Sequence, residues 1–388
     1  MKNVTKDIFY VGVNDHQIDL FEGHFDVPNG MAYNSYVIVD EKVAIMDSVE
    51  INFVNEWIQN IKEVLGTRKP DYLIIQHMEP DHSSSLMEFL KVYPDTVVVG
   101  NSKTFQMMKQ FFFELPEHTL EVKENDELNL GKHNLKFVFA PMVHWPEVMM
   151  TFDSYDKVFF TADAFGKFGA LDYDDPEGWA CEARRYYFGI VGKYGAQVQA
   201  LFRKLNGLGE RIEIICPLHG PVLDDDLGYY LRLYNIWSTY GVETEGVALF
   251  YTSVYGHTKE AVEYLADELR KLGCPKVVVN DLARTDINED VEDAFRYGKV
   301  VFATTTYNMS IFPYMNDFLT MLVERLYQNK TVGLIGNGSW APAAVKVLKE
   351  KIAPCKNLTI LEPEVTIISR MSEENKLQLQ ELAKALMK

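Results

Sequence analysis

The first 143 residues alternate between short apolar runs and stretches whose apolar positions recur with helical spacing. Residues 53–65 and 83–92 have the helical spacing. The apolar or β-branched runs suit strands, and hairpin-like turns join those near the start; the runs are residues 36–39, 43–46, 72–75, 96–99 and 135–139. This order predicts an α+β sandwich in which sheets pack together and helices cover them.

After Gly241 the pattern changes to a regular repetition of one strand and one helix. The expected strands are residues 247–251, 277–279, 300–303 and 332–335, each followed by a helical stretch. Such repetition predicts a doubly wound parallel sheet with helices on both faces. A chain of 388 residues is long enough for two domains. We place the boundary near residues 244–246, which gives domains of residues 1–244 and 245–388.

The overall charge and the N-terminus exclude several classes of partner. A formal net charge of -18 repels nucleic acid and anionic membrane surfaces. The segment 1–7 lacks the basic-then-apolar pattern of a signal peptide, and no apolar run is long enough to span a bilayer. We therefore expect a cytoplasmic protein that binds neither nucleic acid nor membrane.

The four cysteines stand far apart, without a C-x-x-C pair. This spacing suggests neither a thiolate-bound metal nor a disulfide framework. We expect them to be buried small apolar residues; they are Cys181, Cys216, Cys274 and Cys355.

The most informative segment reads His77-Met-Glu79-Pro-Asp81-His82 and directly follows an apolar strand. Residues two apart on an extended chain point the same way, so His77 and Glu79 can converge on one ion. Pro80 then ends the strand, and a helix is expected from Ser83. Asp81 and His82 lie at the turn into that helix, where they can face a second ion.

Three further candidates follow apolar strands in the same half of the chain: His144, Asp163 and His219. A single polar residue at a strand end is more often a cap or a satisfied polar group than a ligand. Seven such groups packed together without a metal, however, would bury several unpaired charges. The pattern therefore favours a site for two metal ions, with nitrogen and oxygen ligands and no thiolate.

This set of residues resembles the metallo-β-lactamase superfamily, whose members carry an H-x-H-x-D-H block, and within it the flavodiiron proteins, which have Glu in place of the second His. The resemblance implies an αββα sandwich that holds two irons with a bridging oxo or hydroxo group. It implies that His77, Glu79 and His144 bind one iron, that Asp81, His82 and His219 bind the other, and that Asp163 bridges both. It also suggests His24 and Tyr194 as residues of the substrate pocket, although a turn histidine and a core tyrosine are equally good interpretations.

Three loops of the C-terminal half suit a flavin. The first lies between a strand and a helix expected from Lys259, where small hydroxyl residues and a glycine present backbone N–H groups to a phosphate. The loops resemble those of flavodoxins, in which the first binds the FMN phosphate and the other two flank the ring. Tyr307 and Trp340 could sandwich the ring; the alternative is a packing role. The loops comprise Thr252, Ser253, Val254, Tyr255, Gly256, His257 and Thr258; Thr304, Thr305, Thr306, Tyr307 and Asn308; and Gly336, Asn337, Gly338, Ser339 and Trp340.

The resemblance implies an oxidoreductase that reduces O2 to water, NO to N2O, or both, with electrons passing through FMN to a di-iron centre. The absence of a C-x-x-C module implies a separate donor, rubredoxin or a flavin reductase. Family members form head-to-tail homodimers or dimers of dimers, so we expect the same here. Two alternatives remain open: a zinc-dependent hydrolase fused to a flavodoxin-like electron carrier, and a non-enzymatic electron carrier with a structural metal site.

Overall fold

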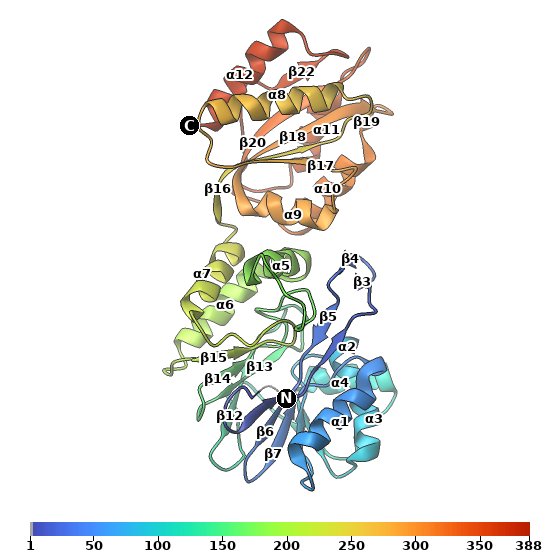
Figure 1. Cartoon of the computed structure of the whole chain (residues 1–388), viewed down its shortest axis with the longest axis vertical. Helices are drawn as coiled ribbons and strands as arrows, with labels where there is room; N and C mark the ends of the chain where they lie inside the picture. The colour runs from blue at the N-terminus through green and yellow to red at the C-terminus, as the bar shows by residue number, and fades with distance from the viewer. Residues whose placement is uncertain (1–2) are drawn as a thin grey trace. The chain divides into compact units, whose positions relative to one another are not determined.

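The structure is a computed structural model that describes residues 3–388 (Figure 1). The chain forms two compact units, one ending at Tyr234 and the other beginning at Asn235. Helix α7 (Leu227–Ser238) crosses this division, and the domain boundary between residues 244 and 245 stays a prediction. None of the helices within residues 3–388 is both long enough and apolar enough to cross a membrane.

The first unit is built on two sheets. One sheet has the strand order β1-β6-β7-β8-β9-β10, and the other has the order β11-β12-β13-β14-β15. Two short hairpin-like pairs, β2 with β5 and β3 with β4, stand beside them. The strands are β1 (Ile8–Tyr10), β2 (Val13–Asp15), β3 (Leu20–Phe21), β4 (Phe25–Asp26), β5 (Met31–Tyr33), β6 (Tyr36–Val39), β7 (Val43–Met46), β8 (Tyr72–Ile74), β9 (Val97–Gly100), β10 (Thr119–Glu121), β11 (Glu127–Asn129), β12 (Asn134–Phe139), β13 (Met149–Asp153), β14 (Val158–Phe160) and β15 (Ile214–Cys216).

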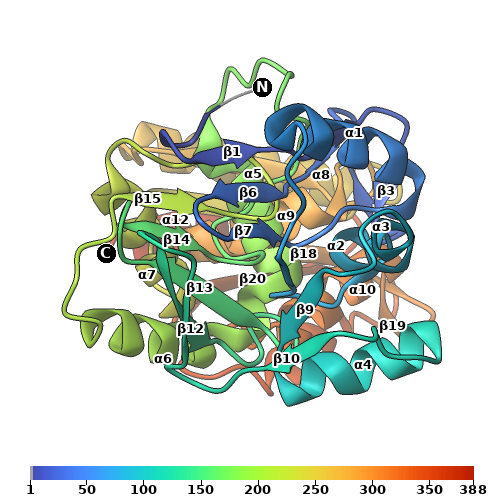
Figure 2. The same ribbon diagram turned by 90° about the horizontal axis from the view of Figure 1, so that it is seen from below.

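Helices cover the outer faces of these two sheets. In Figure 2, β6 and β7 (blue) lie beside β12, β13 and β14 (green), with α1 and α3 outside the blue layer. The helices of this unit, apart from α7, are α1 (Val54–Leu65), α2 (Pro80–Ser83), α3 (Leu86–Val92), α4 (Ser102–Phe112), α5 (Trp179–Tyr186) and α6 (Gly195–Asn206). The predicted start of a helix at Ser83 was wrong. The short helix α2 begins at Pro80 and ends at Ser83, and the next helix, α3, begins at Leu86.

Alternating side chains explain why the two sheets stack. On β6, Tyr36 and Ile38 belong to the core between the sheets, together with Phe137 and Phe160 of the second sheet. Val37 points the other way and packs in the core under the helices. Because successive side chains of a strand point to opposite faces, a strand that is apolar throughout must be covered on both sides. The predicted αββα sandwich is confirmed.

The second unit is one open sheet with the strand order β17-β16-β18-β20-β21 and with β22 beside β20. These strands all run parallel, and only the short β19 pairs antiparallel with β18 among the described strands. The strands are β16 (Thr244–Tyr251), β17 (Val277–Asp281), β18 (Tyr297–Tyr307), β19 (Ser310–Ile311), β20 (Thr331–Asn337), β21 (Thr359–Ile360) and β22 (Val365–Ile367). The helices are α8 (His257–Lys271), α9 (Ile287–Arg296), α10 (Pro313–Glu324), α11 (Ala344–Ile352) and α12 (Glu373–Leu386).

Helices lie on both faces of this sheet, with α8 and α12 on one side and α9 and α10 on the other (Figure 1). Leu249 of β16 packs in one core with Leu265 of α8 and Leu382 of α12. Its neighbour Phe250 faces the opposite side and stacks on Phe318 of α10, with ring centroids 4.9 Å apart. The doubly wound parallel sheet is thus confirmed. Helix α8, however, starts at His257, two positions before the predicted Lys259.

The cysteines are less uniformly buried than predicted. All four are free, but only Cys216 is fully buried, in the core between the sheets of the first unit. Cys274 and Cys355 follow the ends of α8 and α11, and these helix ends face solvent, so both side chains are partly exposed. Cys181 is also partly exposed. The expectation of four buried cysteines was therefore wrong for three of them.

Helix α12 begins with a capping box that predicts a measurable contribution to stability. The Ser372 hydroxyl accepts a hydrogen bond from the Asn375 backbone N–H, and the Asn375 side chain accepts from the Ser372 N–H. Replacing Ser372 with alanine should lower the free energy of unfolding by about 1 kcal/mol, because a helical N–H loses its partner. Denaturant unfolding of the full chain, followed by circular dichroism, measures this change. In the S372A/N375A double variant the loss should be less than the sum of the single losses; additive losses would contradict a reciprocal cap.

A buried histidine at the far end of the first unit predicts a pH-dependent stability. His133 Nδ1 lies 2.9 Å from Asp153 Oδ2, and its Nε2 lies 3.8 Å from Asp7 Oδ2. Burial opposes charging of the ring, but the hydrogen bond that His133 donates to Asp153 and the neighbouring carboxylates raise the pKa of His133 above its ordinary value. A raised folded-state pKa stabilises the fold fully below the unfolded pKa of about 6.5, and the stabilisation is lost as pH rises through the folded pKa.

The variant H133N tests this dependence, because the asparagine amide can replace the Nδ1–H donor without carrying charge. The stability difference between wild type and H133N should be larger at about pH 6 than at about pH 9. Thermal unfolding at the two pH values measures it. A difference that stays the same at both would show that His133 is held as a neutral ring.

Candidate functional site

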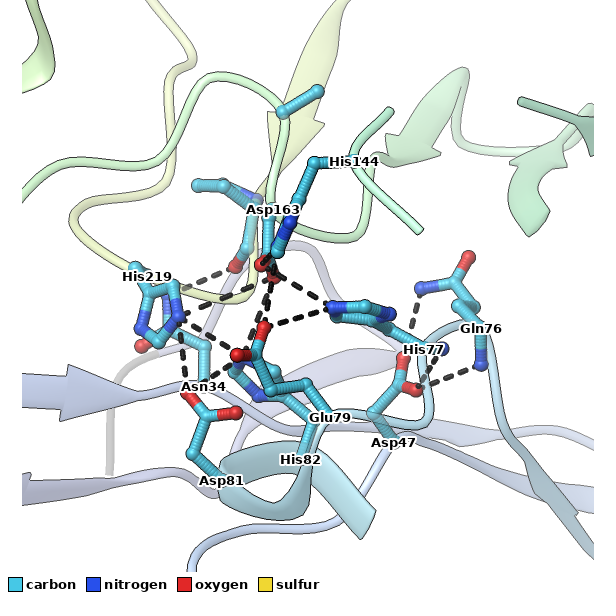
Figure 3. A network of polar contacts seen from close by, with 12 residues as sticks. Asn34, Asp47, Gln76, His77, Glu79, Asp81, His82, His144, Asp163 and His219 are labelled. Carbon is cyan, nitrogen blue, oxygen red and sulfur yellow. Dashed lines mark hydrogen bonds and ion pairs between the residues drawn. The ribbon is translucent and has the colours of Figure 1, made fainter. Parts of the chain in front are cut away.

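The H-x-E-x-D-H segment lies between strand β8 and helix α2 and includes the first turn of α2. Gln76 to Met78 follow β8, and Glu79 stands at the N-cap of α2 with Pro80 at its first turn. The proline-led turn that the sequence predicts is present and carries Asp81 and His82 on α2. The predicted strand is shorter than expected, because β8 ends at Ile74, three residues before His77, and Gln76 and Glu79 lie in bends. The other three side chains, from His144, Asp163 and His219, converge on this segment from distant loops (Figure 3).

The first ligand-like group consists of His77, Glu79, His144 and Asp163, whose potential ligand atoms all lie within 4.8 Å of one another. The Nε2 atoms of His77 and His144 each lie 3.1 Å from Glu79 Oε2. The same two nitrogens lie 3.5 Å and 3.0 Å from Asp163 Oδ2. Two imidazole nitrogens and two carboxylate oxygens therefore surround one point.

The second group consists of Asp81, His82 and His219. The Nε2 atoms of His82 and His219 are 2.9 Å apart, and they lie 3.2 Å and 3.3 Å from Asp81 Oδ2. The other oxygen of Asp163 faces this group, with Oδ1 3.3 Å from His82 Nε2. One carboxylate thus presents Oδ2 to the first group and Oδ1 to the second, which is the arrangement of a bridging ligand.

Hydrogen bonds outside the two groups fix how the imidazoles are oriented. His77 Nδ1 lies 2.8 Å from Glu147 Oε1, and His219 Nδ1 lies 2.8 Å from the Ala32 carbonyl oxygen. Because a carboxylate and a carbonyl only accept, each Nδ1 must carry the proton and donate it. The lone pair of a neutral ring is then on Nε2, the atom that points into the group.

Buried carboxylates also hold the backbone of the segment. Asp47 Oδ1 accepts from the backbone N–H of Gln76 (2.7 Å) and of His77 (3.3 Å), while Oδ2 accepts from the Gln76 side chain (2.9 Å) (Figure 3). Glu147 Oε1 accepts from the Met78 N–H at 2.8 Å. Asp47 and Glu147 were not among the residues predicted from the sequence, because neither belongs to the segment that they support.

The electrostatics of the cluster follow from its burial and its mixed charges. Burial alone would raise the pKa of Asp163, but the charges of His77 and His82 outweigh it and hold this pKa well below its usual range. Burial likewise opposes the imidazolium form of His144, yet its hydrogen bonds to Asp163 and Glu79 raise its pKa to about 9. In the absence of metal ions, the carboxylates of the cluster favour protonated histidines, because only these can balance the negative charge. Bound metal cations would balance the same charge.

Several buried oxygen atoms of the cluster fit a metal better than any protein partner. Neither oxygen of Asp81 makes a hydrogen bond to a described residue, nor does Asp163 Oδ1. Buried oxygens without donors are costly, and a divalent ion in each group would satisfy them. The donor set has four imidazoles and three carboxylates and no thiolate, which suits iron or manganese better than zinc. The residues present therefore fit two such ions.

The two residues predicted to line the substrate pocket belong to a turn and to a helix N-terminus of the first unit. His24 is exposed in the turn between β3 and β4, with its ring 5.0 Å from that of Phe25. Tyr194 is partly buried immediately before α6. Their roles at the site stay predictions.

Tyr186, which was not predicted from the sequence, packs its ring against the cluster, with its centroid 5.5 Å from that of His219. Its buried hydroxyl makes no hydrogen bond to a described residue. Burial and the charges of Asp163, Glu79 and Asp81 raise the pKa of Tyr186 well above its ordinary value, which keeps the phenol protonated. The sequence carries no local signal for Tyr186, because the residue reaches the site only through the packing of α5.

The second unit contains a cavity of about 510 Å³ formed by the three predicted loops. Thirteen of the predicted cofactor-binding residues line it. The other four support the loops: the hydroxyls of Thr252 and Thr304 bond each other at 2.7 Å, Gly256 precedes α8, and Gly336 packs against α11. The thirteen are Ser253, Val254, Tyr255, His257, Thr258, Thr305, Thr306, Tyr307, Asn308, Asn337, Gly338, Ser339 and Trp340.

Large aromatic side chains stand exposed around this cavity. Trp340 is 92% exposed and Tyr255 is 89% exposed, whereas Tyr307 is 43% exposed and packs its edge on Phe312. The volume, the aromatic rim and the hydroxyl-rich floor together suit a planar, phosphorylated ligand such as a flavin nucleotide.

Comparisons with known proteins agree with both halves of this description. Residues 31–220 match the family model described as ODP family beta lactamase, and residues 248–385 match that of a flavodoxin domain. The chain is 29% identical to a nitric oxide reductase of Moorella thermoacetica over 370 residues, which is 94% of this chain and 92% of that protein.

Two solved structures share nearly the whole fold. The rubredoxin oxygen:oxidoreductase of Desulfovibrio gigas has a TM-score of 0.91 and 26% identity, and the match covers 99% of this chain and 97% of that one. The flavodiiron protein of Giardia intestinalis has a TM-score of 0.92 and 26% identity, with 99% and 95% covered. The likeness thus extends over both units.

Proposed function

Because the chain belongs to the flavodiiron proteins, we propose that it is an oxidoreductase that reduces O2 to water, NO to N2O, or both, with electrons delivered through FMN. The observation that carries this proposal is the position of Asp163. Its two oxygens face two separate groups of imidazole and carboxylate ligands. Such a bridge is expected where two metal ions act together on one small molecule.

Seven side chains would hold the two irons. His77, Glu79 and His144 would bind one iron, Asp81, His82 and His219 the other, and Asp163 would bridge them. When bound, the irons and the FMN supply the redox chemistry, in which electrons from FMN reach the irons and reduce the gas there. The task of the protein is to fix the ligand geometry and to keep the pocket dry.

The surroundings of the cluster suit that task. Phe21, Tyr33 and Tyr186 are buried and pack their rings around His219, at centroid distances of 5.4, 6.1 and 5.5 Å. Apolar rings at this position exclude water from the second group of ligands. The Tyr186 hydroxyl stays protonated beside the cluster, so it can donate a hydrogen bond toward it.

The carriers and the assembly are also part of the proposal. We propose an external electron donor of the rubredoxin type or a flavin reductase, and a head-to-tail homodimer or dimer of dimers in which each flavin serves the partner's di-iron site. The sequence has no C-x-x-C pair that could hold an iron electron carrier, which supports a separate donor. Sedimentation of the active enzyme tests the assembly, and a strictly monomeric active species would contradict it. The cytoplasmic location is part of the same proposal.

Anaerobic stopped-flow spectroscopy tests the function. The protein, loaded with iron and FMN and fully reduced, is mixed separately with O2 and with NO. Multiple turnovers of flavin reoxidation are expected with at least one gas. Metal analysis distinguishes the alternative, because zinc in the site together with hydrolysis of ester substrates would favour a lactamase-like hydrolase, whereas failure to consume the gases would favour a pure electron carrier.

A further inference from the structure

The short hairpin of β3 and β4 brings a further acidic residue to the metal-ligand cluster (Figure 1). Phe21 and Phe25 pair across this hairpin, and both are buried. The ring of Phe21 packs edge-on against that of His219, with the centroids 5.4 Å apart. The hairpin is thereby fixed against the second ligand group, and Glu22, the residue after Phe21, stands at the first position of its turn.

The carboxyl group of Glu22 lies against that of Glu79, a residue of the first ligand group. The two carboxyls form a hydrogen bond, and the charges of His144 and Asp81 also act on Glu22. Burial of the carboxyl and the charge of Glu79 raise the pKa of Glu22 to about 8, so Glu22 donates its O–H to Glu79 when no cation is bound. Two carboxyls in contact need either a shared proton or a cation beside them.

Glu22 keeps this contact in a backbone conformation that glutamate rarely adopts. Its φ is 51°, and that of Gly23 is 66°, so two successive residues are in the left-handed region. The outer side of the turn is exposed to solvent, yet the carboxyl of Glu22 meets the cluster. Strained residues persist where their surroundings hold them, and they gather at ligand sites. The contact with Glu79 is therefore maintained against the backbone preference of Glu22.

The charge of the ligand set leaves a place for one more negative group. The seven proposed ligands include three carboxylates, whereas two Fe(II) ions carry four positive charges. A fourth negative charge, from a carboxylate or a hydroxide, would balance this sum, which matters because charges interact strongly in a buried site. Carboxylate oxygens are also among the ligands that iron accepts. Glu22 already touches one of the ligands, so it is placed to supply that charge.

We infer that Glu22 is an eighth ligand of the metal centre, whose carboxylate binds the iron of the first group beside Glu79. This inference rests on the proposed function, because it takes iron as the ion that the cluster holds. A small molecule that binds this iron at the same position must first displace the carboxylate of Glu22. The residue would therefore control which ligands reach the first iron, in addition to helping to hold it.

The experiment measures Fe(II) affinity by anaerobic competition with a chelator, without any turnover. The variant E22Q keeps the shape of the side chain and removes its charge, whereas E22D keeps the charge and shortens the side chain by one methylene. Aspartate tolerates the left-handed backbone, so E22D should fold, and circular dichroism verifies both variants. Both should bind one of the two irons at least about tenfold more weakly than wild type. Wild-type affinity in E22D would show that Glu22 acts through its charge alone and would overturn the inference.

Azide, a small anion that binds open metal positions, gives a second readout in the iron-loaded, oxidised protein through visible absorption. E22Q and E22D should bind azide about tenfold more tightly than wild type, because Glu22 no longer competes for the position. Equal azide affinity in all three proteins would also overturn the inference. The matched control is D26N, which changes an exposed carboxylate of the same hairpin and should equal wild type in both measurements. A wild-type protein that binds no iron would instead overturn the proposed function.

Discussion

Replacing Asp163 with alanine should eliminate binding of both irons, and the reductase activity with it. Each oxygen of this carboxylate faces a different ligand group, at 3.0 Å from His144 Nε2 and 3.3 Å from His82 Nε2. Its loss leaves two incomplete and mutually repelling ion sites, since the negative charge between them is gone. Activity should drop by at least about a thousandfold, as expected when a metal site no longer forms. Iron per chain, after anaerobic loading with Fe(II), measures the loss directly.

The variant Glu79→Ala is the matched control for this experiment. Glu79 contacts His77 and His144 of the first group, while the ligands of the second group lie around Asp81. E79A should therefore lose one iron and keep the other, whereas D163A should keep none. Retention of two irons by D163A would exclude a bridging role for Asp163. Far-ultraviolet circular dichroism of each variant verifies that the fold persists.

Replacing Glu147 with glutamine should weaken iron binding by about tenfold to a hundredfold, although Glu147 is not a ligand. The buried carboxylate accepts from His77 Nδ1 and from the Met78 N–H, each at 2.8 Å. Glutamine keeps the shape of the side chain but removes the negative charge that makes the imidazole a stronger base. Competition with a chelator of known affinity measures the change.

The substitution Glu124→Gln provides the matched control. Glu124 lies in the same unit and pairs with Lys204 at 2.8 Å, so the variant makes the same change of charge at a partly exposed position. Iron affinity of E124Q should equal that of wild type, because an exposed pair contributes little. If E147Q and wild type compete equally with the chelator, Glu147 does not position His77, and its burial serves only the fold.

The ligand residues could be predicted from the sequence because the signal for each is local. His77, Glu79, Asp81 and His82 stand in one short segment, and the other three lie in the loops that follow apolar strands β12, β14 and β15. Strand ends meet at one edge of a sheet, so residues at those ends converge even when they are far apart in the chain. His82 and His219, whose nitrogens lie 2.9 Å apart, are separated by 137 positions.

The supporting residues could not be predicted in this way. Glu147 and His77 are 70 positions apart, and Asp47 and Gln76 are 29 apart. Nothing in the sequence around Asp47 or Glu147 distinguishes a carboxylate that accepts buried N–H groups from one that faces water. Tyr186 is similar, since α5 has several aromatic and charged residues and only its packing decides which one faces the cluster.

The sequence by itself thus determined the two architectures, the elements that carry the loops, and the types of side chain that can bind metal and phosphate. These follow from periodicity and from residue chemistry, which act over a few neighbouring positions. The tertiary structure alone decided which oxygen of Asp163 faces which group, which carboxylates orient the histidines, and that the three loops of the second unit line one cavity. Those features depend on which distant segments come into contact, and contact at long range is set by the packing of the whole unit.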